Sequence, residues 1–260
     1  MSWSRIYDEP EPQRVNRWLA QNGVCSRREA DALIAEGAIF IDGERVEDAG
    51  RKIAPGQKLE VRGGAAAQPG FTAVLNKPIG YVSAQPEKDQ VPAVRLLTRA
   101  ALIGEGAVPD RGARLAPLGR LDQDSRGLLL LSDDGVLAKA VIGPASDLDK
   151  EYLVRVEGQI TERKLALLRH GLKLDGRDLK PALAEARRGQ VLRFVLKEGR
   201  NRQIRRMCAL VDLDVVDLFR IRIGPLPLGD LAEGKWRTLA EGERAALIKA
   251  SSAPPRRTKR

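Results

Sequence analysis

The sequence predicts an α+β protein with a small N-terminal module and a larger C-terminal domain. A run rich in Gly and Ala at residues 63–70 is typical of a flexible linker. Before it, helical periodicity is followed by a hairpin signal, and beyond it apolar strands alternate with few helices. A chain of 260 residues is long enough for one large and one small domain. We therefore place the module at residues 13–62 and the large domain at residues 71–250.

Composition narrows the class of protein. The chain has no apolar run long enough to cross a bilayer, and its start lacks the apolar core of a signal peptide, so we expect a cytoplasmic protein without a membrane role. Cys25 and Cys208 form no Cys-x-x-Cys pair, which argues against a disulfide framework and a zinc site. We expect both thiols to be reduced and Cys208 to lie in the core. The single histidine, His170, argues against a catalytic triad and a histidine-rich metal site.

Positive charge is concentrated in parts of the chain. The net charge of +10 and an isoelectric point near 9.9 favour a polyanionic partner. Residues 251–260 hold four Lys or Arg and no acid, so we expect a basic disordered tail, and residues 1–12, rich in Pro and Glu, are also expected to be unstructured. Residues 187–206 carry eight Lys or Arg against the single acid Glu198. This segment is either a binding surface in a folded region or a solvated charged face.

The N-terminal module is predicted to contain two helices followed by a hairpin. Apolar residues recur at helical spacing over residues 15–20, and Gly23 stops this helix. Ser26 begins the second helix as its N-cap, with Glu29 three residues later as the capping-box partner. The Asp-Gly pair at residues 42–43, between apolar strands, predicts a type I′ hairpin turn.

This module resembles the S4 RNA-binding domain in residues 14–20, 25–30 and 46–61. Its nine Lys or Arg nearly balance eight acids between residues 13 and 62, so net charge alone does not mark it as RNA-binding. The arginines cluster instead, because Arg14 and Arg17 share one helix face. Arg27 and Arg28 stand where the next helix begins, and its free backbone N–H groups also favour phosphate. We expect these four arginines to contact RNA and Trp18 to anchor the core.

The first half of the large domain combines strands with a wrapping segment. Residues 71–83 alternate apolar positions and predict a strand that enters a turn at Lys77-Pro78. Residues 84–117 mix Pro and Gly with a short helical run at 93–102 and are expected to wrap the core. Acids after the buried leucines of residues 128–131 are expected to cap a helix that continues through Val141.

The second half supplies a tyrosine strand and an arginine helix. Residues 150–156 predict a strand with Tyr152 on its core-facing side, where the ring either packs with a satisfied hydroxyl or takes part in chemistry. His170 before Gly171 marks the end of a helix, and residues 191–196 predict another strand. Asn201 is expected to cap a helix whose start directs its dipole and neighbouring arginines at an anion. The apolar stripe of that helix is Ile204, Met207, Cys208 and Val211.

A glycine-flanked turn at residues 119–127 carries Arg120 and Asp122 just before the buried leucines. A carboxylate held rigidly there can act as a nucleophile or a base on an anionic substrate. The spacing alone also fits an ordinary surface turn with an arginine and an aspartate. The remaining motifs of the chain therefore decide between the two interpretations.

Four ordered motifs behind the S4-like module resemble the ribosomal RNA pseudouridine synthases of the RsuA/RluB/RluE/RluF family. They are Gly-Arg-Leu-Asp at 119–122, Lys-Glu-Tyr-Leu-Val at 150–154, Glu-Gly-Arg-Asn-Arg-Gln-Ile-Arg-Arg-Met at 198–207 and Arg-Ile-Gly at 222–224. The resemblance covers nearly all of residues 13–250 and looks closest to the RluF type, which acts on the large ribosomal RNA. It implies an S4 module followed by an α+β domain built on a mixed, mainly antiparallel sheet, with the site in a central cleft.

The resemblance also implies roles for individual residues. The reaction would detach uracil from its ribose and rejoin it through carbon 5, without metal or cofactor. Asp122 would be the nucleophile, attacking either the ribose or the pyrimidine, and Arg205 would pair with it and keep it ionised. Tyr152 would stack on the base and assist proton removal, while Arg120 would support the flipped nucleotide. The remaining expected contacts are Ile223 as a pocket residue and Arg200, Arg202 and Arg206 as RNA-binding residues.

Large-subunit ribosomal RNA is the expected partner, with transfer RNA as a further candidate substrate. We expect a monomer, because no heptad pattern or apolar surface predicts association. One alternative is a catalytically silent RNA-binding or ribosome-assembly protein of the same fold, which would have the same basic surfaces. Another is a hydrolase with Asp122 and Asp124 as its acid–base pair, although carboxylates two residues apart on a turn rarely face both sides of one bond.

Overall fold

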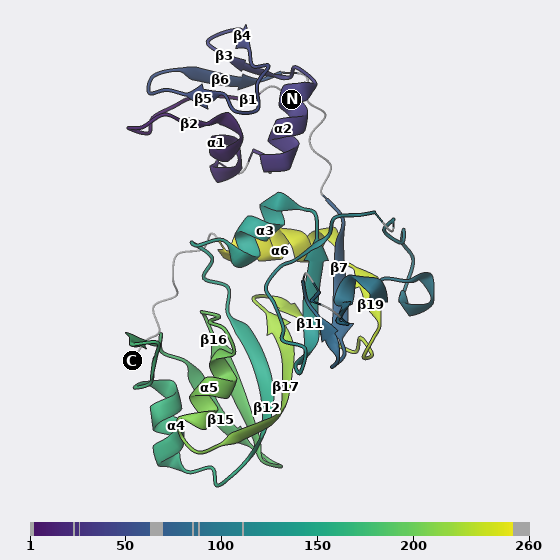
Figure 1. The fold of residues 1–260 in the computed structure, drawn as a ribbon, viewed down its shortest axis with the longest axis vertical. Coiled ribbons are helices and arrows are strands. Elements are labelled where there is room, and N and C mark those ends of the chain that lie inside the picture. Colours follow the sequence, from purple (N-terminus) through teal and green to yellow (C-terminus); the bar gives the residue numbers. More distant parts are fainter. Residues whose placement is uncertain are drawn as a thin grey trace. The chain divides into compact units, whose positions relative to one another are not determined.

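The computed structural model describes residues 3–22, 24–25, 27–62, 70–84, 86–87, 89–110 and 112–251, without the side chain of Arg28. The chain divides into two compact units, one formed by Met1–Gly70 with Asp134–Ala138 and one built from Phe71–Asp133 and from Lys139 onward (Figure 1). The expected linker, apart from Gly70, and the expected tail, apart from Ser251, lie outside the described residues. So do Gly23 and Ser26, the predicted helix stop and N-cap.

The first unit contains two helices and a small sheet, as the periodicity predicts. The Asp-Gly turn is confirmed: Asp42 and Gly43 have φ angles of 49° and 87° and join the paired strands β3 and β4. The sheet runs in the order β1-β6-β3-β4, and a separate ladder pairs β2 with β5. The elements are β1 Trp3–Ile6, β2 Gln13–Arg14, α1 Val15–Gln21, α2 Arg27–Ala35, β3 Ile39–Ile41, β4 Glu44–Arg45, β5 Lys52–Ile53 and β6 Lys58–Val61.

The start of the chain corrects one prediction. Residues 1–12 were expected to be unstructured, but β1 pairs antiparallel with β6 and Tyr7 is buried. Aromatic packing explains this order, because the rings of Trp3 and Tyr7 lie 5.7 and 5.4 Å from the ring of Trp18. Trp18 is itself buried and anchors the core, as predicted. The Pro and Glu content of residues 1–12 predicted disorder and gave no indication of these aromatic contacts.

The second unit is built on a nine-stranded sheet in the order β15-β16-β12-β17-β11-β7-β19, with β10 paired to β11 and β18 to β17. Within this sheet β11 and β17 run parallel and the other pairs antiparallel, so the predicted mixed, mainly antiparallel sheet is confirmed. The strands are β7 Thr72–Lys77, β10 Ala116–Pro117, β11 Arg126–Ser132, β12 Lys150–Glu157, β15 Leu183–Arg187, β16 Val191–Leu196, β17 Asp214–Ile223, β18 Leu226–Pro227 and β19 Trp236–Thr238. Two small ladders pair β8 Tyr81–Val82 with β9 Val91–Pro92 and β13 Lys173–Leu174 with β14 Arg177–Asp178.

Helices α4, α5 and α6 contact strands of this sheet. The helix α4 contacts β15, and α5 contacts β17 (Figure 1). Three residues of the predicted stripe, Ile204, Met207 and Cys208, lie on α5 and are buried. Val211 is also buried, but it lies beyond the end of the helix at Ala209. The helices are α3 Gly135–Ile142, α4 Glu162–Arg169, α5 Gln203–Ala209 and α6 Glu241–Ser251.

The wrapping segment differs from its prediction in one respect. The helical run expected at residues 93–102 consists of two short 3-10 helices, Ala93–Leu96 and Arg99–Ala101. Leu97 and Thr98 leave the helical region between them, with ψ angles of 65° and 161°, so no continuous helix forms. The segment nevertheless buries Ala93 and Leu97 in the core.

Both cysteines are free thiols in buried positions. Burial raises the pKa of Cys25 and of Cys208 to about 12. At neutral pH each side chain is therefore a protonated thiol, and each serves as a small apolar residue.

Candidate active site

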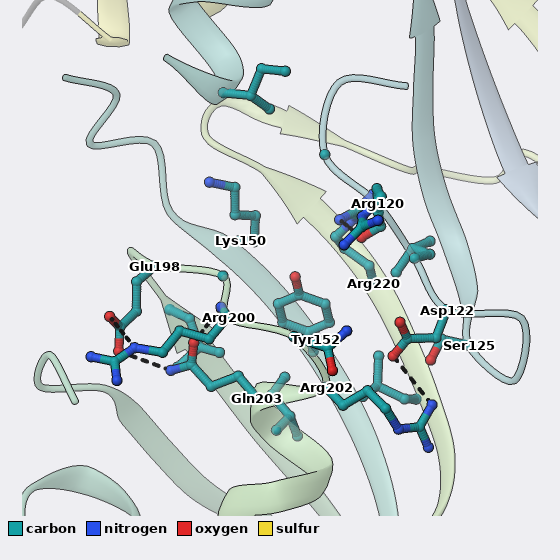
Figure 2. Close-up of a pocket in the computed structure, with 18 of the residues that line it drawn as sticks. Arg120, Asp122, Ser125, Lys150, Tyr152, Glu198, Arg200, Arg202, Gln203 and Arg220 are labelled. Atoms are coloured by element: carbon teal, nitrogen blue, oxygen red, sulfur yellow. Dashed lines mark hydrogen bonds and ion pairs between the residues drawn. The ribbon is translucent and has the colours of Figure 1, made fainter. Parts of the chain in front are cut away.

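A pocket of about 340 Å³ lies where the separated motifs meet (Figure 2). The turn with Asp122 forms one wall, Tyr152 on β12 lies in the middle, and the loop into α5 forms the opposite wall. β17 contributes Leu218 and Arg220, and the end of α3 completes the lining. Three of the four motifs that sequence analysis singled out are thus neighbours around the pocket, and the fourth, at 222–224, is not part of its lining.

The turn that carries Asp122 is held rigidly. The hydroxyl of Ser83 donates to the carbonyl of Leu121 at 2.7 Å and accepts from its N–H at 2.9 Å. The N–H of Ser125 donates to the carbonyl of Asp122 at 3.1 Å and closes a tight turn. The Asp122 side chain is 35 % exposed, so a substrate can reach a carboxylate whose backbone is fixed.

The arginines of the opposite wall do not pair as predicted. Arg205 was expected to pair with Asp122, but its Nε lies 3.3 Å from the carboxylate of Asp124 and its Nη2 donates to the Asp124 carbonyl at 2.8 Å. The guanidinium nearest to Asp122 belongs to Arg202, with Nη1 at 3.5 Å from Oδ2. Arg202 also binds both oxygens of Asp124, at 2.9 and 3.2 Å. Residue spacing offers no means to choose between carboxylates two positions apart.

The charge state of Asp124 excludes it as a proton donor at neutral pH. Burial by itself would raise the pKa of this carboxyl, but the hydrogen bonds from Arg202 and the charges of Arg205 and Arg202 outweigh burial and lower it. Asp124 therefore stays ionised beside its two arginines. A hydrolase with Asp122 and Asp124 as acid and base needs one protonated member, and this pair does not supply it from Asp124.

Tyr152 lies near the centre of the sheet, as predicted. In the ladders of β12 it is opposite Phe194 of β16 and Arg220 of β17, and its ring is half-buried in the pocket. The preceding residue, Glu151, fixes this part of the strand, because its carboxylate lies 2.6 Å from Nε of Arg193 and 2.7 Å from Nε of Arg222. Hydrogen bonds from Arg193 and Arg222 lower the pKa of Glu151, although burial of this carboxylate by itself would raise it.

Sequence analysis assigned no role to three cations around the pocket. Arg220 is 2 % exposed and donates from Nε to the carbonyl of Leu128 at 2.7 Å, yet it lines the pocket. Lys150 also lines it, and burial together with the charge of Arg220 lowers its pKa. Lys77 is fully buried, and burial lowers its pKa to about 8. Lys150 lies within a motif and Lys77 precedes a proline. Lysine and arginine side chains are usually exposed, however, so nothing in the sequence predicted that these would be buried.

The expected RNA-binding arginines have different surroundings. Arg120 is exposed at the pocket lining, whereas Arg200 donates to the backbone carbonyls of three residues of the β13–β14 hairpin. Arg206 forms an ion pair with Asp175 at 2.6 Å and is not part of the lining. In the first unit Arg14, Arg17 and Arg27 are exposed, and the side chain of Arg28 lies outside the described residues.

Two further site predictions are corrected. Ile223 was expected to line the pocket, but it is fully buried near the end of β17, where Leu218 and Arg220 line the pocket instead. Asn201 was expected to cap α5, but the residue before the helix is Arg202, in a left-handed conformation with φ 47°. In the part of the chain that the structure describes, no group of three or more His, Cys, Asp or Glu side chains is placed to hold a metal ion. The described helices also include none with the length and apolarity of a membrane span.

Family models match both units. Residues 72–210 match the model of RNA pseudouridylate synthases, and residues 13–59 match the S4 domain. The pocket residues from Gly119 to Arg205 fall within the first match. Arg14, Arg17 and Arg27 fall within the second.

Similar proteins and structures agree with these matches. Over 240 residues the chain is 33% identical to the dual-specificity RNA pseudouridine synthase RluF of Escherichia coli (strain K12), covering 91% of this chain and 78% of that protein. Over 239 residues it is 31% identical to the ribosomal large subunit pseudouridine synthase B of Bacillus subtilis (strain 168), covering 89% and 93%. A crystal structure of a pseudouridylate synthase has a TM-score of 0.63 and 29% identity, covering 90% of this chain and 99% of that one.

Proposed function

This chain belongs to the RNA pseudouridylate synthase family, and we propose that it converts a specific uridine of large-subunit ribosomal RNA to pseudouridine with Asp122 as the nucleophile. The observation that carries the proposal is the placement of Asp122 at the edge of the pocket that contains Tyr152. Its carboxylate has a single ion-pair contact among the described residues, at 3.5 Å, so its oxygens remain available to a substrate. A buried pocket with a reachable carboxylate is the arrangement that covalent catalysis needs.

The reaction is an isomerisation in which every atom of the nucleotide is kept. The bond between the ribose and ring nitrogen 1 breaks, and a bond between the same ribose carbon and ring carbon 5 forms. Carbon 5 loses its proton and nitrogen 1 gains one, so no oxidant or reductant is consumed. Asp122 attacks either the ribose or the pyrimidine ring and is released when the new bond has formed.

The remaining pocket residues have roles that follow from their positions. The half-buried ring of Tyr152 lines the pocket and offers a flat surface on which uracil would stack. In this proposal its hydroxyl assists proton removal from carbon 5. Arg120 lies exposed on the turn that carries Asp122, where it supports a nucleotide that has left its stack. Arg202 supplies positive charge beside Asp122, and Arg205 supplies it beside Asp124 on the same turn.

The choice of RNA rests on the relatives and on the first unit. The relative from Bacillus subtilis is named for the large ribosomal subunit. That from Escherichia coli is named as dual-specificity, which agrees with a second RNA substrate, for which transfer RNA is our candidate. Arg14, Arg17 and Arg27 provide exposed cations for the phosphates of such an RNA. Arg28, Arg200 and Arg206 belong to the same proposed RNA-binding set. We place the enzyme in the cytoplasm as a monomer.

Chemical mapping of pseudouridine tests this function. Ribosomal and transfer RNA from cells that carry the wild type or Asp122→Asn are compared at every modified position. We expect one large-subunit position to lose its pseudouridine in the variant, which names the target. If every pseudouridine persists, the protein is a silent RNA-binding or assembly factor for those RNAs, and the enzymatic proposal is wrong.

A further inference from the structure

Two carboxylates of one turn compete for the same arginine. Asp124 binds Arg202 through two oxygens, at 2.9 and 3.2 Å, whereas Asp122 has one contact with it at 3.5 Å. A two-point pair between an arginine and a carboxylate is short, directional and strong, and it occupies the lone pairs of the carboxylate. The Asp124 carboxylate is therefore held in a two-point ion pair, whereas the Asp122 carboxylate is not.

Arg205 cannot replace Arg202 in this contact. Its Nη1 donates to the carbonyl of Val215 at 3.1 Å, and its Nη2 donates to the backbone carbonyl of Asp124 at 2.8 Å. Its Nε faces the Asp124 carboxylate at 3.3 Å but makes no hydrogen bond in the structure. Arg205 is thus fixed by the backbone, and Arg202 carries the guanidinium that is able to change partners.

The backbone of Arg202 points to the same conclusion. Arg202 stands directly before α5 with φ 47° and ψ 33°, a left-handed conformation that is unfavourable for a residue other than glycine. No side chain caps the helix from this position. The ion pair with Asp124 offsets part of this cost and holds the guanidinium at one place on the pocket edge.

We propose that Asp124 is a positioning residue that holds Arg202 away from Asp122, so that the nucleophile lies beside positive charge but is not held in a two-point ion pair. The inference rests on the proposed role of Asp122 as the nucleophile. In the absence of the Asp124 charge, Arg202 rotates by a short distance and forms the two-point pair with Asp122. An attack by Asp122 then requires that pair to be broken first, which slows the chemical step more than the binding of RNA.

Asp124→Asn tests the proposal because it keeps the shape of the side chain and removes its charge. The rate is measured as tritium release from carbon 5 of uridines in a labelled transcript of large-subunit ribosomal RNA. We expect kcat to fall about 10- to 100-fold, with KM changed by less than about 3-fold. A merely structural role of Asp124 would not be relieved by a second substitution at Arg202.

A double variant tests whether Asp122 and Asp124 compete for Arg202. In Asp124→Asn combined with Arg202→Gln, the released guanidinium is gone, and we expect kcat at saturating RNA to recover at least about 3-fold over Asp124→Asn alone. Asp124→Glu, which keeps the charge, should retain more activity than Asp124→Asn. Glu243→Gln is the matched control, because it breaks another two-point arginine pair, with both contacts at 2.7 Å to Arg237, outside the pocket.

The outcomes separate this proposal from the proposed function. Wild-type kcat in Asp124→Asn, a change in KM alone, or a double variant no faster than the single one each overturns the role of Asp124. Thermal unfolding of each variant confirms that the compared enzymes are folded. Asp122→Asn is assayed alongside, and if it keeps wild-type activity, the proposed nucleophile is wrong whatever Asp124 does.

Discussion

Arg220 reaches across the sheet to Leu128, donating from Nε to its carbonyl at 2.7 Å while its side chain is almost completely buried. The same guanidinium approaches the carbonyl of Arg120 at 3.4 Å, so it links β17 both to β11 and to the turn with Asp122. Arg220→Ala leaves a cavity and removes the donor to the Leu128 carbonyl. We expect a loss of about 2–4 kcal/mol in the free energy of unfolding, measured with urea. Arg155→Ala, at an exposed position of β12, should change it by less than about 0.5 kcal/mol; equal effects would contradict a structural role for Arg220.

Lys77 makes stability depend on pH in the alkaline range. Burial lowers its pKa to about 8 from an ordinary value of 10.5, while its ammonium donates to the carbonyls of Pro78 and Tyr81. Below pH 8 the lysine is charged in both states, and its burial destabilises the fold. Between about pH 8 and 10.5 the unfolded chain binds more protons on Lys77 than the folded chain does, so stability rises with pH.

Lys77→Met removes this dependence. The difference in unfolding free energy between wild type and variant is expected to shift in favour of wild type by up to about 3 kcal/mol across that pH range. Lys249→Met, at an exposed position of α6, controls for the titration of ordinary lysines. A difference that stays flat from neutral to alkaline pH would show that Lys77 has an ordinary pKa.

Tyr152 is expected to act through its ring and its hydroxyl in separable ways. Tyr152→Phe keeps the stacking surface, so RNA binding should stay near the wild-type value while the turnover rate falls. Tyr152→Ala removes the surface and should weaken binding of the flipped base by about 1–3 kcal/mol. Binding is measured by filter retention and turnover by tritium release. Loss of binding in Tyr152→Phe would refute the stacking role.

The arginines of the first unit should appear in the salt dependence of RNA binding. Each phosphate contact contributes about 0.9 to the slope of log affinity against log salt for a duplex and about 0.7 for a single strand. Replacing exposed Arg14 and Arg17 together by Ala should therefore reduce the slope by about 1.4 to 1.8. Arg163→Ala, on an exposed position of α4, should leave it unchanged. An unchanged slope in the double variant would exclude these arginines from the RNA contact.

Local patterns predicted the elements whose burial is periodic. The strand Val191–Leu196 was predicted with the same bounds that the structure has, and the apolar stripe of α5 is buried as its spacing requires. The turn at Asp42 formed because an Asp-Gly pair adopts positive φ angles at low cost. In each case the cause lies in neighbouring residues.

Contacts between distant residues were not predictable in the same way. Whether Arg205 meets Asp122 or Asp124 depends on how α5 lies beside the turn, and residue spacing does not contain that distance. Arg220 is buried because the carbonyl of Leu128, 92 positions away, accepts its hydrogen bond. The strand at Trp3–Ile6 forms because β6 offers it an edge. These features depend on packing, which local periodicity does not describe.

The parallel pair of β11 and β17 lies inside the sheet, between the strands on the side of β12 and those on the side of β7. It consists of two residue pairs, Arg126 with Phe219 and Gly127 with Arg220, and a Cβ on Gly127 would lie only 2.3 Å from the Arg220 carbonyl oxygen. Asp122 lies on the turn before β11, on one side of this pair, whereas Tyr152 on β12 and Arg220 on β17 lie on the other. The close approach of β11 and β17 thus requires that Gly127 has no side chain, and a larger residue there would push apart the two strands that carry the two sides of the pocket.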